Sequence, residues 1–468
     1  MPGAGVGVLQ GRPAAETAGE MEAFRSGARP ATLMNRIVRG FTPDEVRALS
    51  DWFDAGMSTR RALLGGALVA PFLGRPSRAA GSARVVVVGG GYGGASCARA
   101  LRQADPKLDV TLVEANAEYL SCPFSNPVVA GLREMDGQRF TLRGLDGIRL
   151  VQARATAVDP VARAVRFDGG ALPYDRLVLS PGVEMRFDVL PGYDAAAAEL
   201  FPHAWSAGPQ TLLLRRQLEA LPDGGTVLLS VPANPYRCPP GPYERASLIA
   251  WFLKTHKPRA KLLVLDAKDV FSKQKLFQAA WQTLYPDTLE WVGQSAGGTV
   301  TAVDPDGTLQ TDFGLHKADV VNVIPPQRAG RIASVAADRS GWCPVDPVTF
   351  ESKQAPGIHV IGDAAIMGAM PKSAFAANAQ AKVCAAAIAA LLSDAQPEEP
   401  RLINTCYSLV QPGYAISVAG VYRPVRGQLT DIEGAGGTSA LDAPASVRAL
   451  EAQYAEAWYR TITLQAFG

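Results

Sequence analysis

The sequence has little of several features that would place it in a specialised class of protein. It holds only six cysteines in 468 residues, too few for a disulfide-built scaffold. Its formal net charge is only +2, so nothing in the composition suggests a nucleic-acid partner. The chain contains no C-x-x-C-H segment, which excludes covalent haem attachment. The remaining composition is that of an ordinary globular protein long enough for two or three domains.

Glycine is plentiful by contrast, and one glycine-rich stretch organises the chain. The stretch RVVVVGGGYGGASCA begins with four valines, which are typical of a buried parallel strand. Gly89, Gly91 and Gly94 follow in G-x-G-x-x-G spacing, which brings backbone against a pyrophosphate and packs the next helix closely. A second apolar strand at residues 110–113 ends in Glu114, near the usual place of an acid that binds ribose hydroxyls. These signals favour a dinucleotide site over a glycine-rich turn without ligand.

A second signal of the same kind stands far downstream. The segment GIHVIGDA supplies a strand that ends in Gly362 and Asp363. In flavoproteins with two dinucleotide-binding domains, such a pair follows a strand, and its aspartate binds a ribitol hydroxyl. Two such signals separated by an inserted domain are more specific than either alone, so FAD is the expected cofactor.

The inserted region bears on the electron donor. Its strand at residues 225–231 is followed by PANPYRCPPGPYER, where a nicotinamide-binding domain would carry its glycine fingerprint. Prolines lack N–H groups and restrict the backbone, so this turn makes a poor pyrophosphate cradle. NAD(P)H is therefore not expected as a substrate, and Cys238 in the same turn becomes a candidate for the chemistry.

The part of the chain before the first strand has a different character. Residues 1–32 are rich in Gly, Ala, Pro and Glu, and we expect them to be disordered. Thr42 and Glu45 predict a capped amphipathic helix, and this stretch, with Met34, resembles the last part of a class I cytochrome c. Residues 1–56 are thus interpreted as a disordered segment and a cytochrome remnant, or an over-extended start. The alternative is a short helix of no special meaning.

An export signal is predicted at residues 57–83. Arg60 and Arg61 precede an apolar run at residues 62–73 and then small residues, an order that suggests the twin-arginine type. The run is too short to span a bilayer, and no transmembrane segment is expected. The interpretation implies a periplasmic protein, and the alternative is a buried hairpin or helix of the mature chain.

The remaining pattern predicts an α/β fold with two Rossmann-like domains and a C-terminal α+β interface domain. The expected parts are an FAD-binding domain at residues 84–194 and 316–392, a second Rossmann-like domain at 195–315 and an interface domain at 393–468. Helices are expected at residues 244–255, 276–284 and 374–392, and strands at 262–265, 299–303 and 320–324.

Several segments follow one another along the chain and are informative as a set. They are the glycine fingerprint, Glu114, YLSCPFSNPVVAG, NPYRCPPGPYERAS, GWCPVDPVTFES, GIHVIGDA, MPKSAFAANAQAK and NTCYSLVQPGYAISVAGVYR. Together, and in this order, they resemble the flavoprotein subunit of flavocytochrome c sulfide dehydrogenase. The resemblance implies the glutathione-reductase-like fold shared with sulfide:quinone oxidoreductases. It also implies sulfide as substrate and a separate c-type cytochrome subunit, which carries the haem.

The resemblance further implies roles for individual residues. Cys122 matches the cysteine that the family bonds to the flavin 8α-methyl group. Cys238 and Cys406 match the family's redox-active disulfide, with Cys343 as a competing partner for Cys238. Lys372 resembles a motif near the flavin, where it could stabilise the reduced ring, although a surface lysine is the alternative.

Other residues and functions remain open at this point. Glu244 either manages protons in the site or simply faces a helix dipole, and Cys97 and Cys384 are expected to be packing residues. A sulfide:quinone oxidoreductase would need an amphipathic membrane-binding end, which residues 443–468 do not resemble. A non-catalytic flavin-holding partner of another oxidase is a further alternative.

Overall fold

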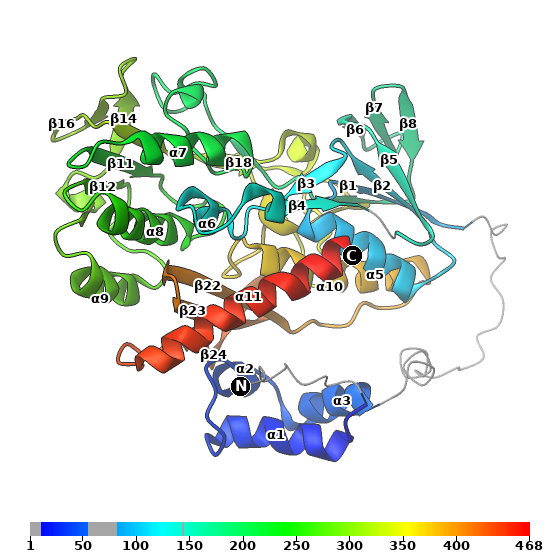
Figure 1. The fold of residues 1–468 in the computed structure, drawn as a ribbon. Helices are drawn as coiled ribbons and strands as arrows, with labels where there is room; N and C mark the ends of the chain where they lie inside the picture. The colour runs from blue at the N-terminus through cyan, green and yellow to red at the C-terminus, as the bar shows by residue number, and fades with distance from the viewer. Residues whose placement is uncertain (1–10, 55–81, 143–144) are drawn as a thin grey trace, which may run out of the picture.

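The computed structural model describes residues 11–54, 82–142 and 145–468 (Figure 1). The chain has an α/β fold, as predicted, with a parallel sheet in each of two domains. The main elements of the first domain are β1 (Arg84–Val88), α5 (Tyr92–Ala104), β2 (Asp109–Glu114), β5 (Ile148–Gln152), β6 (Ala155–Asp159), β7 (Ala164–Phe167), β8 (Gly170–Pro173), β9 (Arg176–Leu179), β20 (Ile358–Val360) and α10 (Ala374–Leu392).

The first domain is built on a five-stranded parallel sheet of order β20-β9-β1-β2-β5. The four valines at residues 85–88 form its central strand and are buried, because both faces of the sheet are covered. Helices α5 and α10 pack against each other, and α10 has the bounds predicted from the sequence. The glycine turn thus leads from the central strand directly into α5.

The second domain holds a four-stranded parallel sheet of order β13-β12-β11-β17. Its elements are α7 (Pro209–Ala220), β11 (Thr226–Val231), α8 (Gly241–His256), β12 (Lys261–Asp266), α9 (Gln274–Leu284), β13 (Leu289–Val292), β14 (Val300–Val303), β15 (Leu309–Thr311), β16 (Gly314–His316) and β17 (Val320–Val323). The predicted boundary at residue 315 is wrong, because β17 pairs with β11 rather than with the first domain. The second domain therefore includes this strand.

The C-terminal domain is α+β, as predicted. Strands β22 (Leu402–Gln411), β23 (Tyr414–Val425) and β24 (Gln428–Thr438) form an antiparallel sheet, and α11 (Ala445–Phe467) packs on it. At the end of α11 the ring of Phe467 stacks on Tyr119 and Phe140 of the first domain. This contact joins α11 to the first domain.

The N-terminal part is helical where it is described. Its elements are α1 (Ala14–Ser26), α2 (Met34–Ile37), η1 (Val38–Gly40) and α3 (Pro43–Asp54). The expectation of disorder over residues 1–32 is therefore wrong for α1, which packs against α3. The predicted capping box is confirmed, since Thr42 and Glu45 exchange side-chain and backbone hydrogen bonds. Most of the predicted export signal at residues 57–83 lies outside the described residues.

This N-terminal segment, residues 11–54, lies against the C-terminal sheet (Figure 1). A Cβ built at Gly40 would come 2.7 Å from a methyl carbon of Val421, so the Val421 side chain of β23 packs directly against the backbone of η1. Arg36 donates hydrogen bonds to the carbonyl of Gly437 at 2.7 Å and to the hydroxyl of Ser417 at 3.1 Å. Polar and close apolar contacts thus hold the segment in place.

The shorter elements connect these parts. They are β3 (Glu118–Leu120), α6 (Ser125–Val129), η2 (Met135–Gln138), β4 (Arg139–Thr141), β10 (Val183–Met185), η3 (Ala197–Glu199), η4 (Gln294–Ala296), β18 (Gln327–Ala329), η5 (Arg331–Ala336), β19 (Cys343–Pro344), η6 (Gly362–Ala364) and β21 (Ala365–Ile366).

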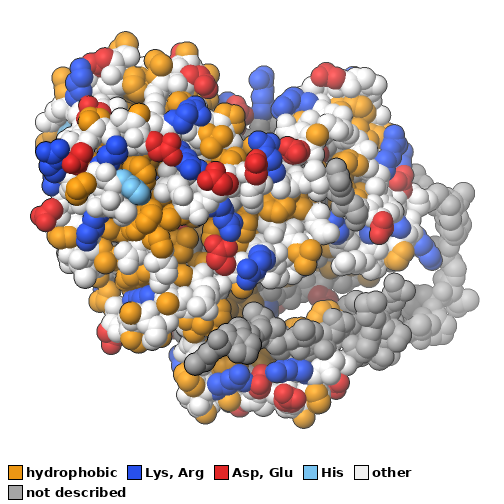
Figure 2. All heavy atoms as spheres, in the orientation of Figure 1, with side chains coloured by type: hydrophobic (Ala, Val, Ile, Leu, Met, Phe, Trp, Pro, Cys, Tyr) orange, Lys and Arg blue, Asp and Glu red, His pale blue; other side chains and the backbone are white. Residues whose placement is uncertain are grey.

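Two surface properties bear on partners. On the face shown in Figure 2, basic and acidic side chains are interspersed, in keeping with the small net charge. Among the described helices, α10 is the one that is long and apolar enough to cross a membrane. Half of its most apolar stretch is buried inside the protein, as in a core helix, which makes it weak evidence for a span.

Candidate active site

One cavity lies where the three domains meet, and it gathers most of the residues that the sequence singled out. Its wall includes residues from β1, the glycine turn, the turn after β11, η6 and β22. The predicted site residues on the wall are Gly89, Gly91, Glu114, Cys122, Cys238, Gly362, Asp363 and Cys406. Gly94 and Lys372 are not on the wall, although each directly follows or precedes a residue that is.

The glycine turn has the geometry that its spacing predicts. Gly89 has φ +100°, and a Cβ there would overlap the carbonyl oxygen of Ser180. Gly91 is the N-cap of α5, so the free N–H groups of that helix end belong to the cavity region. Gly94 sits inside the first turn of α5, where a Cβ would overlap the carbonyl oxygen of Gly89. Its role is therefore close helix packing.

Two carboxylates on the wall suit the hydroxyl groups of a dinucleotide. Glu114 accepts the backbone N–H of Gly90 at 2.6 Å and that of Asn116 at 2.8 Å, and it still lines the cavity. Asp363 has a buried Oδ1 that no group in the described part of the chain hydrogen-bonds. Burial raises the pKa of Asp363. An orphaned buried oxygen at this position fits a hydroxyl donor of the bound cofactor.

Three cysteines reach the same cavity from three domains. The Cys122 sulfur lies 3.9 Å from the carbonyl oxygen of Trp205. Cys238 has φ +59°, and its backbone N–H donates to the carbonyl of Lys372 at 2.9 Å. Cys406 lies on β22, and its sulfur accepts the Asn404 amide at 3.6 Å. All are free thiols in this structure.

The other cysteines lie elsewhere. Cys343 is fully buried, and its thiol donates to the carbonyl of Ala333 at 3.5 Å. It is not on the cavity wall, which weakens its candidacy as the partner of Cys238. Cys97 and Cys384 face each other between α5 and α10, and both are buried in the core. They are packing residues, as expected.

Lys372 lies beside the cavity wall, between the turns that carry Asp363 and Cys238. Its ammonium donates to the carbonyls of Asp363 at 2.9 Å and Ala365 at 2.7 Å, and it lies 3.8 Å from the centre of the Trp342 ring. Burial lowers the pKa of Lys372 to about 8. In the described structure it braces the turn of Asp363 and, through its carbonyl, the turn of Cys238, while a stabilising effect on the reduced flavin stays a prediction.

Three charged groups near the cysteines define the local charge, and only Glu244 is singled out by the sequence analysis. Its carboxylate accepts the N–H of Leu409 at 3.1 Å and the Asn126 amide at 3.3 Å, and burial raises its pKa. The two others are Arg237 and Lys273. Their positive charges offset the burial of thiolates and carboxylates in the cavity.

Sequence reasoning missed Arg237 and Lys273 for different reasons. Arg237 directly precedes Cys238, donates to the carbonyl of Trp205 and faces Asp363, so its position in the motif was an available signal. Lys273 precedes α9 and donates to the Ser408 hydroxyl at 2.7 Å. No local pattern marks it, because only the tertiary fold brings it to β22.

Comparison with known proteins identifies the family. The model "Sulfide dehydrogenase [flavocytochrome c] flavoprotein chain, central" matches residues 211–325, and "Flavocytochrome c sulphide dehydrogenase, flavin-binding" matches residues 398–467. The sulfide dehydrogenase flavoprotein chain of Chlorobaculum thiosulfatiphilum is 60% identical over 48 residues, which are 10% of this chain and all of that sequence. This chain belongs to the flavocytochrome c sulfide dehydrogenase flavoprotein family. The resemblance stated from the motifs is thereby confirmed.

More distant relatives agree with this assignment. A pyridine nucleotide-disulphide oxidoreductase model matches residues 83–208 of this flavoprotein. Mitochondrial sulfide:quinone oxidoreductase of Mus musculus is 26% identical over 60% of this chain, and the alignment spans 65% of the mouse protein, just under two thirds of its length. The structure of the Aquifex aeolicus sulfide:quinone oxidoreductase superposes with a TM-score of 0.61 at 17% identity, covering 82% of this chain and 92% of that one. That likeness confirms the fold.

Proposed function

We propose that this protein oxidises hydrosulfide through Cys238 and Cys406 with FAD as cofactor, and passes the electrons to a c-type cytochrome. The observation that carries the proposal is the meeting of these two cysteines in one cavity with the predicted flavin residues. The cysteines come from different domains and are far apart in the sequence. Family membership independently supports a flavin and sulfide chemistry.

The cavity residues fit FAD. The glycine turn and the start of α5 would hold the pyrophosphate, Glu114 a ribose and Asp363 the ribitol chain. Cys122 would form the thioether to the flavin. FAD supplies an acceptor for two electrons that can release them one at a time.

The chain's own part is thiol–disulfide exchange. In the oxidised protein Cys238 and Cys406 would be joined by a disulfide. Hydrosulfide attacks one sulfur, so that a new S–S bond forms, the old one breaks and the second sulfur leaves as a thiolate. Glu244, a buried carboxyl whose pKa is raised, can hold a proton beside the pair.

The proposal also includes an electron acceptor and a cellular location, which rest on separate grounds. Flavocytochrome families pair the flavoprotein with a cytochrome, and this chain lacks the motif that would bind haem covalently. The family models favour this acceptor over the quinone named for the mouse and Aquifex relatives. Periplasmic localisation rests on the export signal predicted at residues 57–83.

An anaerobic reduction experiment tests the proposal. Sulfide and, separately, NADH are added to the purified protein while the flavin absorbance is followed. Sulfide should bleach the flavin in the wild type and in Cys343→Ala, but not in Cys238→Ser or Cys406→Ser. Bleaching by NADH alone, or full bleaching by sulfide in either serine variant, rejects the proposal. Reoxidation by cytochrome c or by a short-chain quinone then identifies the acceptor.

A denaturing gel tests the covalent link. In the wild type and in Cys97→Ala, flavin fluorescence should migrate with the chain, whereas Cys122→Ser should release its flavin. Release of all flavin from the wild type would rule out the thioether.

A further inference from the structure

The two cavity sulfurs have different polar surroundings. The Cys406 sulfur accepts a hydrogen bond from the side-chain amide of Asn404. That amide is oriented by Ser373, whose hydroxyl donates to the Asn404 oxygen at 2.6 Å and accepts the N–H of Ala376 at 3.0 Å. The hydrogen-bond network thus directs an N–H donor at Cys406. Among the described residues, no side chain makes such a bond to the sulfur of Cys238.

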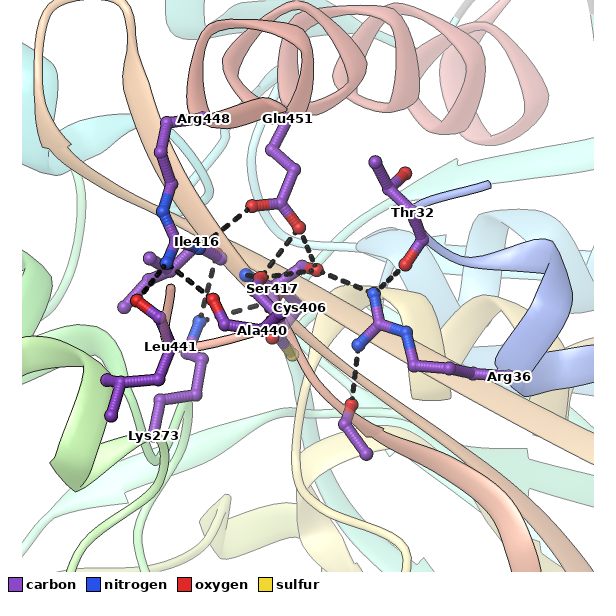
Figure 3. A network of polar contacts seen from close by, with 12 residues as sticks. Thr32, Arg36, Lys273, Cys406, Ile416, Ser417, Ala440, Leu441, Arg448 and Glu451 are labelled. Atoms are coloured by element: carbon purple, nitrogen blue, oxygen red, sulfur yellow. Dashed lines mark hydrogen bonds and ion pairs between the residues drawn. The ribbon is translucent and has the colours of Figure 1, made fainter. Parts of the chain in front are cut away.

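A buried lysine lies beside Cys406 (Figure 3). Lys273 is 6% exposed and has φ +62°, and its side chain reaches from the second domain to the C-terminal sheet. Its Nζ donates to Ser408 Oγ at 2.7 Å, to the Cys406 carbonyl at 3.2 Å and to the Ile416 carbonyl at 3.5 Å. These oxygens are neutral. Lys273 is therefore a buried cation whose polar contacts in the described structure include no carboxylate.

The two acids that face Lys273 are committed to other partners. The Glu244 carboxylate accepts the N–H of Leu409. Glu451 lies 3.5 Å from a guanidinium nitrogen of Arg448 and accepts the Ser417 hydroxyl at 2.6 Å (Figure 3). A buried cation is costly unless an anion compensates it. Two other groups that act on the ammonium can become anions, and both are cysteine thiols, Cys406 and Cys238.

We propose that Lys273 is the counter-ion of a Cys406 thiolate, so that hydrosulfide becomes bonded to Cys238 and Cys406 is the sulfur released. This assignment rests on the proposed function. In the step, the HS⁻ sulfur attacks Cys238, a Cys238–S–SH persulfide forms and the Cys238–Cys406 bond breaks. Its electron pair stays on Cys406 as the thiolate, and the proton remains on the outer sulfur. Lys273 acts as a positioning and charge-compensating residue.

The titration of the two thiols agrees with this geometry. Burial raises the pKa of both cysteines. At Cys406 the strongest opposing influence is the Lys273 ammonium, followed by the hydrogen bond from Asn404, while Glu244 opposes ionisation. At Cys238, after burial, the largest influences are Cys406 and Glu244, which raise the pKa further, and the Lys273 and Arg237 charges only partly offset them. The better leaving group is the sulfur with the lower pKa.

Alkylation of the reduced protein tests the assignment without sulfide turnover. The full-length flavoprotein is reduced, treated with iodoacetamide at a series of pH values, and analysed cysteine by cysteine with peptide mass spectrometry. In the wild type, Cys406 should react at lower pH than Cys238. Lys273→Met should raise the midpoint for Cys406 by about one pH unit, or slow its alkylation about tenfold at neutral pH.

Two further variants test whether the positive charge at position 273 is responsible. Lys273→Arg should restore most of the Cys406 profile, because it keeps the positive charge. Lys275→Met removes an exposed lysine from the first turn of α9, two residues after Lys273, and should leave the profile unchanged. An unchanged Cys406 midpoint in a folded, flavin-loaded Lys273→Met protein overturns the proposal. The proposal is also overturned if Cys238 reacts at lower pH than Cys406 in the wild type. This comparison needs no variant.

Brief exposure of the oxidised protein to sulfide, followed by trapping, locates the persulfide. One extra sulfur on the Cys238 peptide supports the assignment, whereas an extra sulfur on the Cys406 peptide overturns it. A protein whose flavin is not reduced by sulfide at all would refute the proposed function, yet the alkylation profiles would still decide the role of Lys273.

Discussion

The carboxylate of Glu114, at the end of β2, accepts the backbone N–H of Gly90 at 2.6 Å. The bond fixes the glycine turn and the acid relative to each other before any ligand binds. A hydrogen bond to a charged group contributes roughly 1.5–3 kcal/mol, more than one between neutral groups.

Removing this carboxylate should weaken both the fold and flavin retention. We expect Glu114→Ala to lower the free energy of unfolding by about 1–3 kcal/mol and to reduce the flavin bound per chain. Thermal unfolding and absorbance ratios measure the two effects. Glu118→Ala is the control, because Glu118 is exposed and pairs on the surface with Arg139. Equal behaviour of the two variants would contradict the assigned role.

A methyl group at Gly94 should be far more damaging than one at another helical glycine. The Cβ of Gly94→Ala would overlap the backbone oxygen of Gly89, which no side-chain movement relieves. We expect a loss of at least about 3 kcal/mol or failure to fold. Gly137→Ala, where nothing lies within 4 Å of the added carbon, should be nearly neutral. Soluble expression and urea unfolding distinguish the two, and a stable, flavin-loaded Gly94→Ala protein would refute the packing argument.

Arg36 should hold the N-terminal segment on the C-terminal sheet. Its contacts with Gly437 and Ser417 are lost in Arg36→Ala, and we expect docking to weaken by about 1–3 kcal/mol. Amide hydrogen exchange should then accelerate in residues 14–54, while the amides of the first domain keep their protection from exchange. Arg39→Ala, at an exposed position of the same segment, is the matched control. Unchanged exchange in Arg36→Ala would show that apolar contacts suffice.

Acidification should destabilise the protein partly through His203. Burial lowers the pKa of His203 from 6.5 to about 4, and its Nδ1 accepts the N–H of Trp205 at 2.9 Å. Between these pH values the unfolded chain binds a proton that the folded chain does not, so stability falls as the pH drops below 6.5. The loss from this group reaches about 2 kcal/mol at pH 5.

A variant that cannot titrate should escape this loss. His203→Asn keeps an oxygen that can accept the Trp205 N–H, so its unfolding free energy should fall less between pH 7 and 5. His256→Asn, at an exposed position, should follow the wild type. Urea unfolding at several pH values gives the comparison, and parallel curves for His203→Asn and the wild type would exclude the histidine as the source.

Local signals explain which elements the sequence predicted. The valines before Gly89 predict a strand and the alanine-rich stretch predicts helix α10, each from a short local pattern. Both elements are present in the structure. Strand β17 was assigned to the wrong domain because its pairing partner, β11, is set by tertiary structure. Helix α1 was missed because its glycine and alanine content was interpreted as disorder, although its packing against α3 supplies the stabilisation that composition does not show.

The residues of the candidate site also differ in whether a local sequence pattern predicts them. Cys122, Cys238 and Cys406 stand in family-like motifs, so their meeting in one cavity could be expected. Lys273 could not, because an isolated lysine before a helix has no signature until β22 lies beside it. Lys372 was identified by a motif, but its contacts with the Asp363 carbonyl and the Trp342 ring could not be predicted, since a motif does not tell which side of a turn the side chain takes.

The composition of the cavity wall has a consequence for how the protein is made. The wall begins with Val88 and Gly89 near the start of the flavin-type domain, and it includes Ala455 and Trp458 of α11. During synthesis the first domain leaves the ribosome before α11 does, so its part of the wall is exposed to solvent until α11 has been made. A chain that has not yet produced α11 therefore lacks one side of the wall, and we expect it to retain a flavin less well than the chain that includes this helix.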